Sequence, residues 1–182
     1  MNKKEILEWV RVIVGAIVIA LMVMFFIKPT IVKESSMEPN FYEDDYLLVS
    51  QQSYKLFHEE PERGDVIIFK SHLPDKEGHD KLLIKRVIGL PGEKVDVHDG
   101  KVYINGEEID DSYTNDLTTT GTVEDAVVPK DEYFVLGDNR KVSVDSRYSD
   151  VGFVPKDSIV GKVVFRLMPF RRMGIIHNPY DK

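Results

Sequence analysis

Residues 12–39 read VIVGAIVIALMVMFFIKPTIVKESSMEP, which joins an apolar run, a charged boundary and a small polar motif. The run over residues 12–27 has no charged side chain and ends at Lys28-Pro29. Ser36 follows Lys28 closely, and an extended chain covers at most about 3.5 Å per residue, so Ser36 lies within roughly 30 Å of the end of the run. Any chemistry of this serine therefore takes place close to the membrane that the run would enter.

The apolar run is interpreted as a retained transmembrane helix rather than a cleaved signal peptide. Its residues at 1.5 Å rise span about 24 Å, a little less than the ~30 Å hydrocarbon core, and residues 6–10 lengthen the span if Arg11 snorkels to the interface. A cleaved signal peptide has a shorter apolar core and ends in small residues, whereas this run ends in Phe25-Phe26-Ile27. Charged residues on the two sides set the orientation only weakly. We expect residues 1–28 to form a short cytoplasmic stub and one span of the cell membrane, and residues 29–182 to form an extracytoplasmic domain.

Length and composition limit what that domain can be. Of the 182 residues, about 150 remain after the anchor, which suits one domain with one core. The formal net charge of −7 argues against a nucleic-acid partner. The chain has no cysteine, which excludes disulfides, thiolate nucleophiles and cysteine-built metal sites.

The soluble part has the pattern of a mainly β domain. Short apolar runs alternate with turn residues, and Asn105-Gly106 is the strongest two-residue hairpin signal. No convincing amphipathic helix follows Ile27, so we predict an all-β domain with a polar, acidic excursion at about residues 107–128. The predicted strands are 46–49, 66–69, 82–88, 95–97, 102–104, 133–136 and 160–165.

Two basic residues interrupt one of these strands. Lys85 and Arg86 stand between Ile84 and Val87, and side chains alternate along a strand, so we expect one of them to point into apolar surroundings and the other to face out. One interpretation is an ordinary strand lysine that snorkels to water. The other is a buried lysine, whose pKa falls and which can then take a proton from a serine. Taken alone, Ser36 is an ordinary loop serine, and Ser35 is an equal candidate.

Three separated segments carry a family resemblance: SSMEP at 35–39, KRVIGLPGE at 85–93 and GDNRKVSVDSR at 137–147. In this order, behind an N-terminal anchor, they resemble the bacterial type I signal peptidases in the single-span form typical of Gram-positive members. The resemblance extends from the anchor to residue 163, and the third segment is long and specific.

The resemblance implies a β-rich fold with a Ser–Lys dyad, in which Ser36 is the nucleophile, Lys85 is the general base and Ser143 orients the lysine. It implies further supporting residues, namely Met37, Asp138, Asp145 and Arg147. It also implies cleavage of signal peptides from exported pre-proteins after small residues, at the outer membrane–water boundary. No cofactor and no metal are implied, and we expect a monomer whose partners are signal peptides and membrane lipid.

The chain departs from the family pattern at two positions. Two residues before the nucleophile the family usually has Gly or Ser, whose hydroxyl in some members helps to bind the oxyanion, but here stands Glu34. An ionised carboxylate offers no donor, so we expect Glu34 to point to water and the oxyanion to rest on backbone N–H groups, chiefly that of Ser36. Asn40 replaces the family's usual Thr after the proline. Because of these departures, a relative of the family with low activity stays an alternative interpretation of the chain.

The remaining polar features are interpreted as ordinary surface. Two of the histidines, His72 and His79, flank Asp75, Lys76 and Asp80 and are weak metal candidates, with a surface loop as the simpler interpretation. Residues 165–172, FRLMPFRR, are either a last strand and loop or a contact for anionic lipid headgroups. All five histidines are expected to be solvated, namely His58, His72, His79, His98 and His177.

Two functions of different class stay open at this point. The first is a membrane-bound serine endopeptidase that removes signal peptides. The second is an anchored extracytoplasmic binding or assembly domain in which Ser36 and Lys85 are only structural. Another Ser–Lys protease, such as a self-cleaving repressor, would need a DNA-binding segment and conflicts with the anchor.

Overall fold

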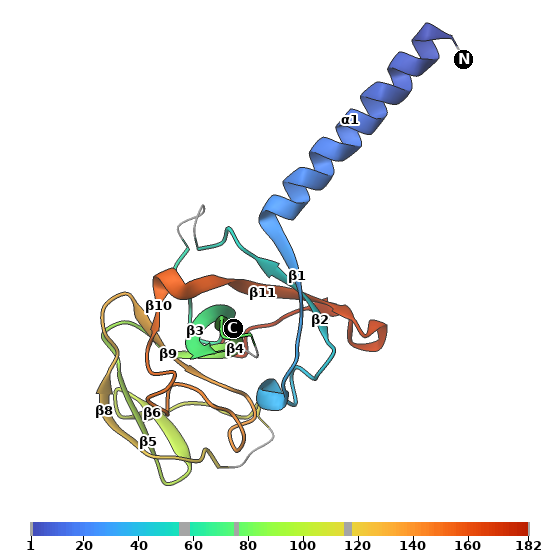
Figure 1. Ribbon diagram of the computed structural model, residues 1–182. Helices are drawn as coiled ribbons and strands as arrows, with labels where there is room; N and C mark the ends of the chain where they lie inside the picture. Colours follow the sequence, from blue (N-terminus) through green and yellow to red (C-terminus); the bar gives the residue numbers. More distant parts are fainter. Residues whose placement is uncertain (1, 55–58, 75–76, 115–117, 182) are drawn as a thin grey trace.

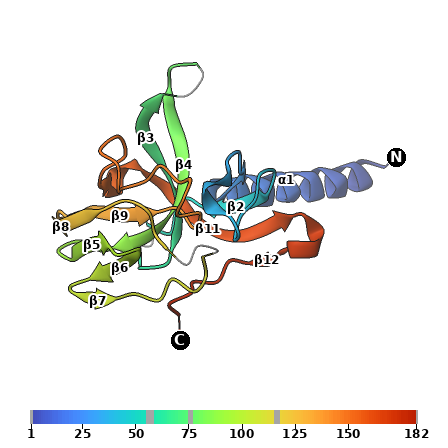
Figure 2. The same cartoon turned by 90° about the horizontal axis from the view of Figure 1, so that it is seen from below.

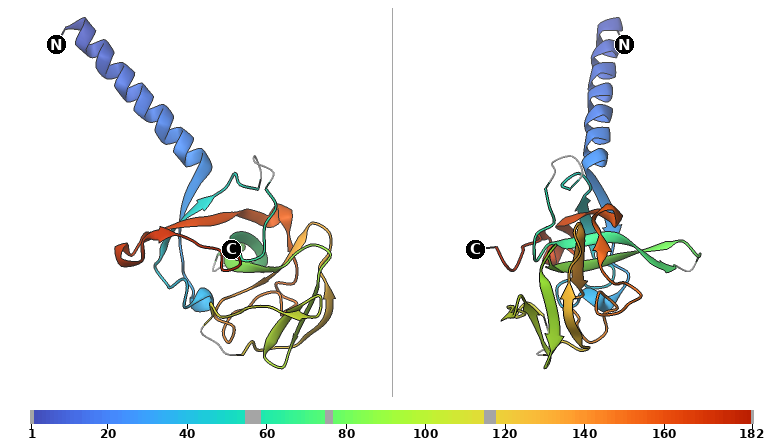
Figure 3. Two further views of the ribbon diagram at one scale, coloured as in Figure 1. Left: turned by 180° about the vertical axis from the view of Figure 1, so that it is seen from behind. Right: turned by 90° about the vertical axis from the view of Figure 1, so that its left-hand side faces the viewer.

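The computed structural model describes residues 2–54, 59–74, 77–114 and 118–181. Its first element is one long helix, α1 (Lys3–Phe26), whose 24 residues at 1.5 Å rise span about 36 Å. No residue of α1 is buried, and Figures 1 and 3 show it standing clear of the β domain. The helix is long and apolar enough to cross a membrane. Residues 6–10 therefore do extend the apolar run into a single helix.

The chain passes from α1 directly into a strand, which corrects the expected end of the helix. Ile27 belongs to β1 (Ile27–Ile31) and pairs with Ser50 of β2 (Tyr46–Ser50). The helix ends here because Pro29 disfavours helical backbone at the residue before it. The anchor and the β domain are thus joined by a strand rather than by a loose linker.

The larger of two sheets has the strand order β1-β2-β11-β3-β4-β9-β10, with β12 paired to β11. All its pairs are antiparallel. Every strand run predicted for this sheet is present, whereas β1, β10 and β12 were not predicted. Its further strands are β3 (Val66–Pro74), β4 (Asp80–Gly89), β9 (Glu132–Leu136), β10 (Val154–Pro155), β11 (Ile159–Met168) and β12 (Gly174–Ile175). Short 3₁₀ turns accompany them: η1 (Ser35–Met37), η2 (Lys156–Ser158) and η3 (Phe170–Arg172).

The middle of this sheet is buried on both faces. Along β3, Ile67 and Phe69 pack into one apolar cluster, while Val66 and Ile68 pack into another on the opposite side. A strand covered on both faces reads as a continuous apolar run rather than an alternating one. This double burial matters for β4, the neighbour of β3, because side chains of either orientation lose contact with water there.

The smaller sheet has the order β7-β6-β5-β8, formed by β5 (Lys94–His98), β6 (Lys101–Ile104), β7 (Glu107–Glu108) and β8 (Val123–Val127). Asn105 and Gly106 both have positive φ, at 53° and 85°, as the predicted hairpin turn requires. The predicted polar excursion contains β7 and β8, and residues 115–117 of it lie outside the described residues. Figure 2 shows this sheet and α1 at opposite ends of the molecule.

Candidate active site

The structure brings Ser36 and Lys85 into direct contact. Lys85 Nζ lies 2.7 Å from Ser36 Oγ and 3.0 Å from the carbonyl oxygen of Ile84. Ser36 is 7% exposed and Lys85 is 1% exposed, whereas Ser35 is exposed. Of the two adjacent serines, only Ser36 is therefore in position to give its proton to the lysine.

Ser36 is held in place by its neighbours on both sides. Met37, which is fully buried, anchors η1 in the apolar cluster that also contains Val66 and Ile68. The backbone N–H of Asn139 donates to the carbonyl oxygen of Ser36 at 3.0 Å. The approach is so close that a Cβ on Gly137 would lie 2.4 Å from that same oxygen, which explains a glycine at this position.

The side chain of Lys85 is buried. Among the described residues, no carboxylate lies within ion-pair distance of its Nζ. Burial lowers the pKa of Lys85 to about 8, because water no longer solvates the ammonium. The negative charges of Asp145, Glu34 and Asp138 act against this effect, and the positive charge of Lys81 acts with it. A substantial fraction of the amine is thus neutral, and able to accept a proton, near pH 8.

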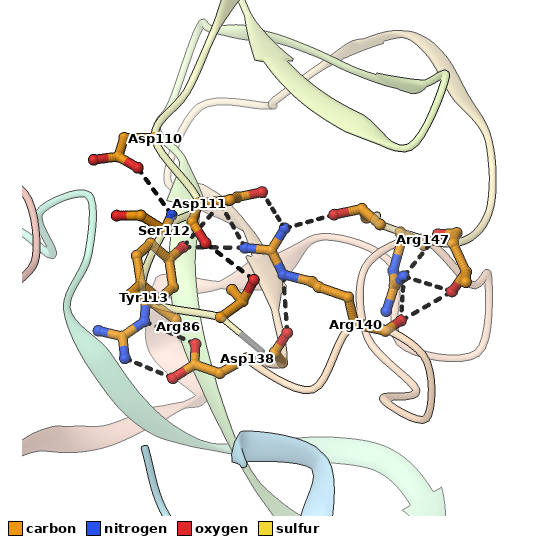
Figure 4. A network of polar contacts seen from close by, with 12 residues as sticks. Arg86, Asp110, Asp111, Ser112, Tyr113, Asp138, Arg140 and Arg147 are labelled. Carbon is orange, nitrogen blue, oxygen red and sulfur yellow. Dashed lines mark hydrogen bonds and ion pairs between the residues drawn. The ribbon is translucent and has the colours of Figure 1, made fainter. Parts of the chain in front are cut away.

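Arg86, the next residue, corrects the expectation that one of the two basic residues faces out. It is 3% exposed, because β4 is an inner strand with buried side chains on both faces. Its guanidinium donates to both carboxylate oxygens of Asp138, at 2.8 and 2.6 Å, and lies 4.7 Å from the centre of the Tyr113 ring (Figure 4). Burial alone would lower the pKa of Arg86, but the charge and hydrogen bonds of Asp138 more than reverse this.

A second buried arginine extends the network, and sequence reasoning missed it. Arg140 forms a two-pronged ion pair with Asp111, donates to Thr119 Oγ1 at 2.8 Å and donates to the carbonyl oxygen of Gly137 at 3.1 Å (Figure 4). Asp111 and Thr119 come from the polar excursion, to which no chemistry had been assigned. Arg140 stands inside the third family-like segment, but no spacing in the sequence indicates its distant partner.

Asp145 and Arg147, two of the expected supporting residues, form an ion pair with each other. Arg147 donates from Nε and Nη2 to the two oxygens of Asp145, at 2.7 and 2.8 Å, and both side chains are buried. Asp145 also accepts the N–H of Gly137 at 2.9 Å. This pair therefore fixes the segment that carries Gly137 against Ser36.

Ser143 lies beside the dyad but does not make the bond expected of it. Its hydroxyl is buried and has no hydrogen-bond partner among the residues that the structure describes. A Cβ on Gly137 would lie 2.2 Å from Ser143 Oγ and 2.4 Å from the Ser36 carbonyl oxygen, so the hydroxyl lies beside η1. An orphaned hydroxyl at this place has its donor and acceptor capacity free for Lys85 or for a substrate.

The two departures from the family pattern both have partners. Asn40 donates to Asp138 Oδ2 at 2.9 Å and to the carbonyl oxygen of Tyr113 at 2.9 Å, which ties the segment after η1 to the charged network. The side chain of Glu34 is 44% exposed, in line with the expectation that it points to water. It also forms an ion pair with Lys81 of β4, which the sequence did not indicate.

The other polar candidates stay apart from the site. The described histidines, His72, His79, His98 and His177, are exposed, as expected. His58, Asp75 and Lys76 lie outside the described residues. Across residues 2–54, 59–74, 77–114 and 118–181, no three His, Cys, Asp or Glu side chains converge as metal ligands.

Comparison with known proteins gives matches over almost the whole chain. Residues 6–168 match the model of a family described as "Signal peptidase, peptidase S26". A "Probable signal peptidase I-2" of Synechocystis sp. is 38% identical over 181 residues, covering 97% of this chain and 79% of the relative. A "Signal peptidase IB" of Staphylococcus aureus (strain COL) is 37% identical over 195 residues, covering 97% of each chain. A crystal structure of a signal peptidase I from Enterococcus faecalis V583 is 35% identical, with a TM-score of 0.47, and covers 57% of this chain and 97% of that one.

Proposed function

The chain belongs to the signal peptidase family, peptidase S26, and from this premise we propose that Ser36 is its nucleophile and Lys85 its general base. Its activity is that of a signal peptidase I, a serine peptidase that removes signal peptides from secreted pre-proteins. The observation that supports the two roles is the 2.7 Å contact between Lys85 Nζ and Ser36 Oγ, made at a buried lysine. A catalytic nucleophile and its base need this hydrogen-bond distance.

The reaction follows from this contact. Neutral Lys85 takes the proton from Ser36 as Oγ attacks the scissile carbonyl, and the ammonium then gives the proton to the departing amine of the mature protein. Lys85 next takes a proton from water, which attacks the acyl ester and releases the carboxylate of the signal peptide. Ser36 regains its proton from Lys85 as the ester breaks. The backbone N–H of Ser36 is our candidate donor to the oxyanion of both intermediates.

An edge of β4 supports binding of an extended substrate. β9 pairs with β4 only from Arg86 onward, so among the described strands none pairs with the stretch from Lys81 to Lys85 on that side. An extended peptide can add to such an edge, with alternate side chains entering pockets. Signal peptides end in small residues of the A-x-A type. A bulky residue at one or three positions before the cut should then block cleavage, while the position between should tolerate change.

The anchor and one surface corner support a position at the outer face of a membrane. α1 is consistent with a single-pass anchor, and we propose that residues 29–182 face outward. The corner around η3 exposes Phe170 (72%), Met173 and Ile175 beside Arg171, and projects beyond the end of β11 on the side toward which α1 leans in Figure 1 and in the left view of Figure 3. We propose that this corner contacts lipid. The dyad is complete within one chain, which supports action as a monomer.

The test of this assignment uses the full chain in detergent with a purified pre-protein. Ser36→Ala should abolish turnover, since no other group can form the acyl ester, while Ser35→Ala should retain most of it. Equal loss in both variants would remove Ser36 from its role. Full activity of Ser36→Ala would instead favour a different nucleophile elsewhere in the chain.

A further inference from the structure

A second contact joins the two chain segments that carry the dyad. Glu34, two residues before Ser36, pairs with Lys81, four residues before Lys85 on β4. The segment leading into η1 and the strand β4 are therefore linked twice, once by Ser36 and Lys85 and once by Glu34 and Lys81. The second link lies at the free edge of β4 where the substrate is proposed to bind.

Glu34 sets an electrostatic problem for the reaction. Negative charge develops on the scissile carbonyl oxygen next to Ser36, and a nearby carboxylate opposes it. The same carboxylate favours the charged form of Lys85, which is the form that cannot act as a base. An unpaired Glu34 would thus slow both parts of the first step.

We propose that Lys81 is a positioning residue for the proposed reaction, which holds the Glu34 carboxylate away from Ser36 and neutralises its charge at the mouth of the site. Both side chains are partly exposed, at 36% for Lys81 and 44% for Glu34, so the pair adds little to folding stability. Its value lies in the opposite signs with which the two residues act on Lys85: Glu34 raises the pKa of the lysine and Lys81 lowers it. The other charges that act on Lys85, those of Asp145 and Asp138, are each committed to a buried arginine.

The proposal makes a signed prediction for three variants. Lys81→Met leaves Glu34 unpaired, and kcat/KM at pH 7 should fall about tenfold, the effect of a unit charge at about 10 Å and an effective dielectric constant of about 20. The acid limb of the pH–rate profile should move to higher pH by up to about one unit. Glu34→Gln should be as active as the parent chain or more so. Glu34→Gln combined with Lys81→Met removes both charges and should return to about the rate of the parent chain, because the opposite effects of the two charges on Lys85 cancel in both proteins.

The experiment measures pH profiles of kcat/KM for the full chain in detergent, at low and at high salt. The defect of Lys81→Met should shrink at high salt, since the pair is accessible to ions. The matched control is Lys101→Met, which loses an exposed pair with Glu108 in the smaller sheet and should behave as the parent chain.

Other outcomes overturn the proposal in distinct ways. Faster cleavage by Lys81→Met would mean that the pair blocks substrate entry. Equal defects in all three variants would mean that the pair only joins the two segments. The proposal rests on Ser36 as nucleophile, and the two claims fail separately: activity of Ser36→Ala refutes the dyad, whereas an inactive Ser36→Ala with an unaffected Lys81→Met refutes only the role of Lys81.

Discussion

Lys85 and Arg86 are consecutive residues of β4, both almost fully buried, and they serve two different regions of the molecule. Lys85 points toward Ser36, and its Nζ contacts the hydroxyl of Ser36 and the carbonyl oxygen of Ile84. Arg86 points into the charged network, where Asp138 accepts from two of its nitrogens. Burial lowers the pKa of both cations, but among the described residues only Arg86 has a carboxylate within ion-pair distance.

The difference lies in both the residue and its partner: a buried lysine can lose its proton, whereas a buried arginine keeps its charge and needs a carboxylate beside it. Lys85 forms no ion pair with a described carboxylate, and burial lowers its pKa to about 8. A substantial fraction of the side chain is therefore a neutral amine near that pH. With Asp138 in place, Arg86 stays charged and its pKa is raised. One strand thus holds the proposed general base and a structural cation side by side.

The largest effect is expected when the reactive cation is made permanently charged. Lys85→Arg keeps a positive charge that does not dissociate in proteins, so cleavage should fall by about 10²–10⁴-fold, the usual contribution of a general base. Lys85→Met, which keeps only the apolar stem, should be equally inactive. The reciprocal change Arg86→Lys keeps the charge that faces Asp138 and should cost far less. The measurement is pre-protein cleavage near pH 8.5, and near-normal activity of Lys85→Arg would remove Lys85 as the base.

Removing the counter-ion of the structural cation should unfold the protein more easily. Asp138→Ala leaves Arg86 buried and unpaired, which should lower the free energy of unfolding by about 3–5 kcal/mol, or roughly 150- to 5000-fold in the folding equilibrium. Urea denaturation in detergent, followed by circular dichroism, measures this. Adding Arg86→Met to Asp138→Ala should restore part of the loss. The exposed pair of the smaller sheet provides the control, since Glu108→Ala should leave the urea midpoint unchanged.

Changing Ser143 tests whether the reaction of Ser36 and Lys85 needs a third polar group. Its hydroxyl has no partner in the described part of the chain, yet lies beside η1, so we expect it to engage Lys85 during turnover. Ser143→Ala should fold normally and cost about 10–1000-fold in rate, as for other positioned catalytic groups. Ser143→Thr keeps the hydroxyl and should recover activity if the extra methyl group fits. Unchanged activity of Ser143→Ala would leave the orphaned hydroxyl without a catalytic role.

The smallest expected effect follows the titration of Lys85 itself. The active form is the neutral amine, so below its pKa of about 8 the rate should fall about tenfold for each unit of decreasing pH. Above that value the rate should level off, since further loss of protons leaves the base unchanged. A profile of kcat/KM from pH 6 to 10 measures the limb. A profile that already levels off near pH 6 would contradict the assignment.

Much of the larger sheet could be predicted because most of its strands are local apolar runs in the sequence. The runs at 66–69 and 133–136 are buried strands in the structure. In the smaller sheet, Asn105-Gly106 forms the predicted turn between β6 and β7. The helix ends at Phe26, two residues before the predicted end of the span at residue 28, since the pairing of Ile27 with Ser50 is a contact between distant parts of the chain. β8 was missed because its acidic sequence VEDAV has no apolar alternation, and its pairing with β5 sets its structure.

In the candidate site, too, the residues within local motifs could be predicted and the long-range contacts could not. Ser36 and Lys85 were identified through the motifs around them, and the structure brings the two together. The prediction that Arg86 or Lys85 faces out was wrong because alternation predicts exposure only where one face of a sheet is open. Two ion pairs, Asp111 with Arg140 and Glu34 with Lys81, join residues that are far apart in sequence, so no local pattern could indicate them.

The direct passage from α1 into β1 would fix the distance between the membrane and the proposed cleavage site. Phe26 is the last residue of the helix and Ile27 already pairs with Ser50 in the sheet, so no flexible linker separates the helix from the sheet. With α1 in a bilayer, the five residues of β1, at about 3.3 Å each, and the four residues between β1 and Ser36 would hold the proposed nucleophile at a set height above the lipid. A pre-protein whose apolar segment stays in the lipid has to bridge that height with the few residues that precede its cut. The enzyme would then select where to cut by distance from the membrane as well as by side-chain size.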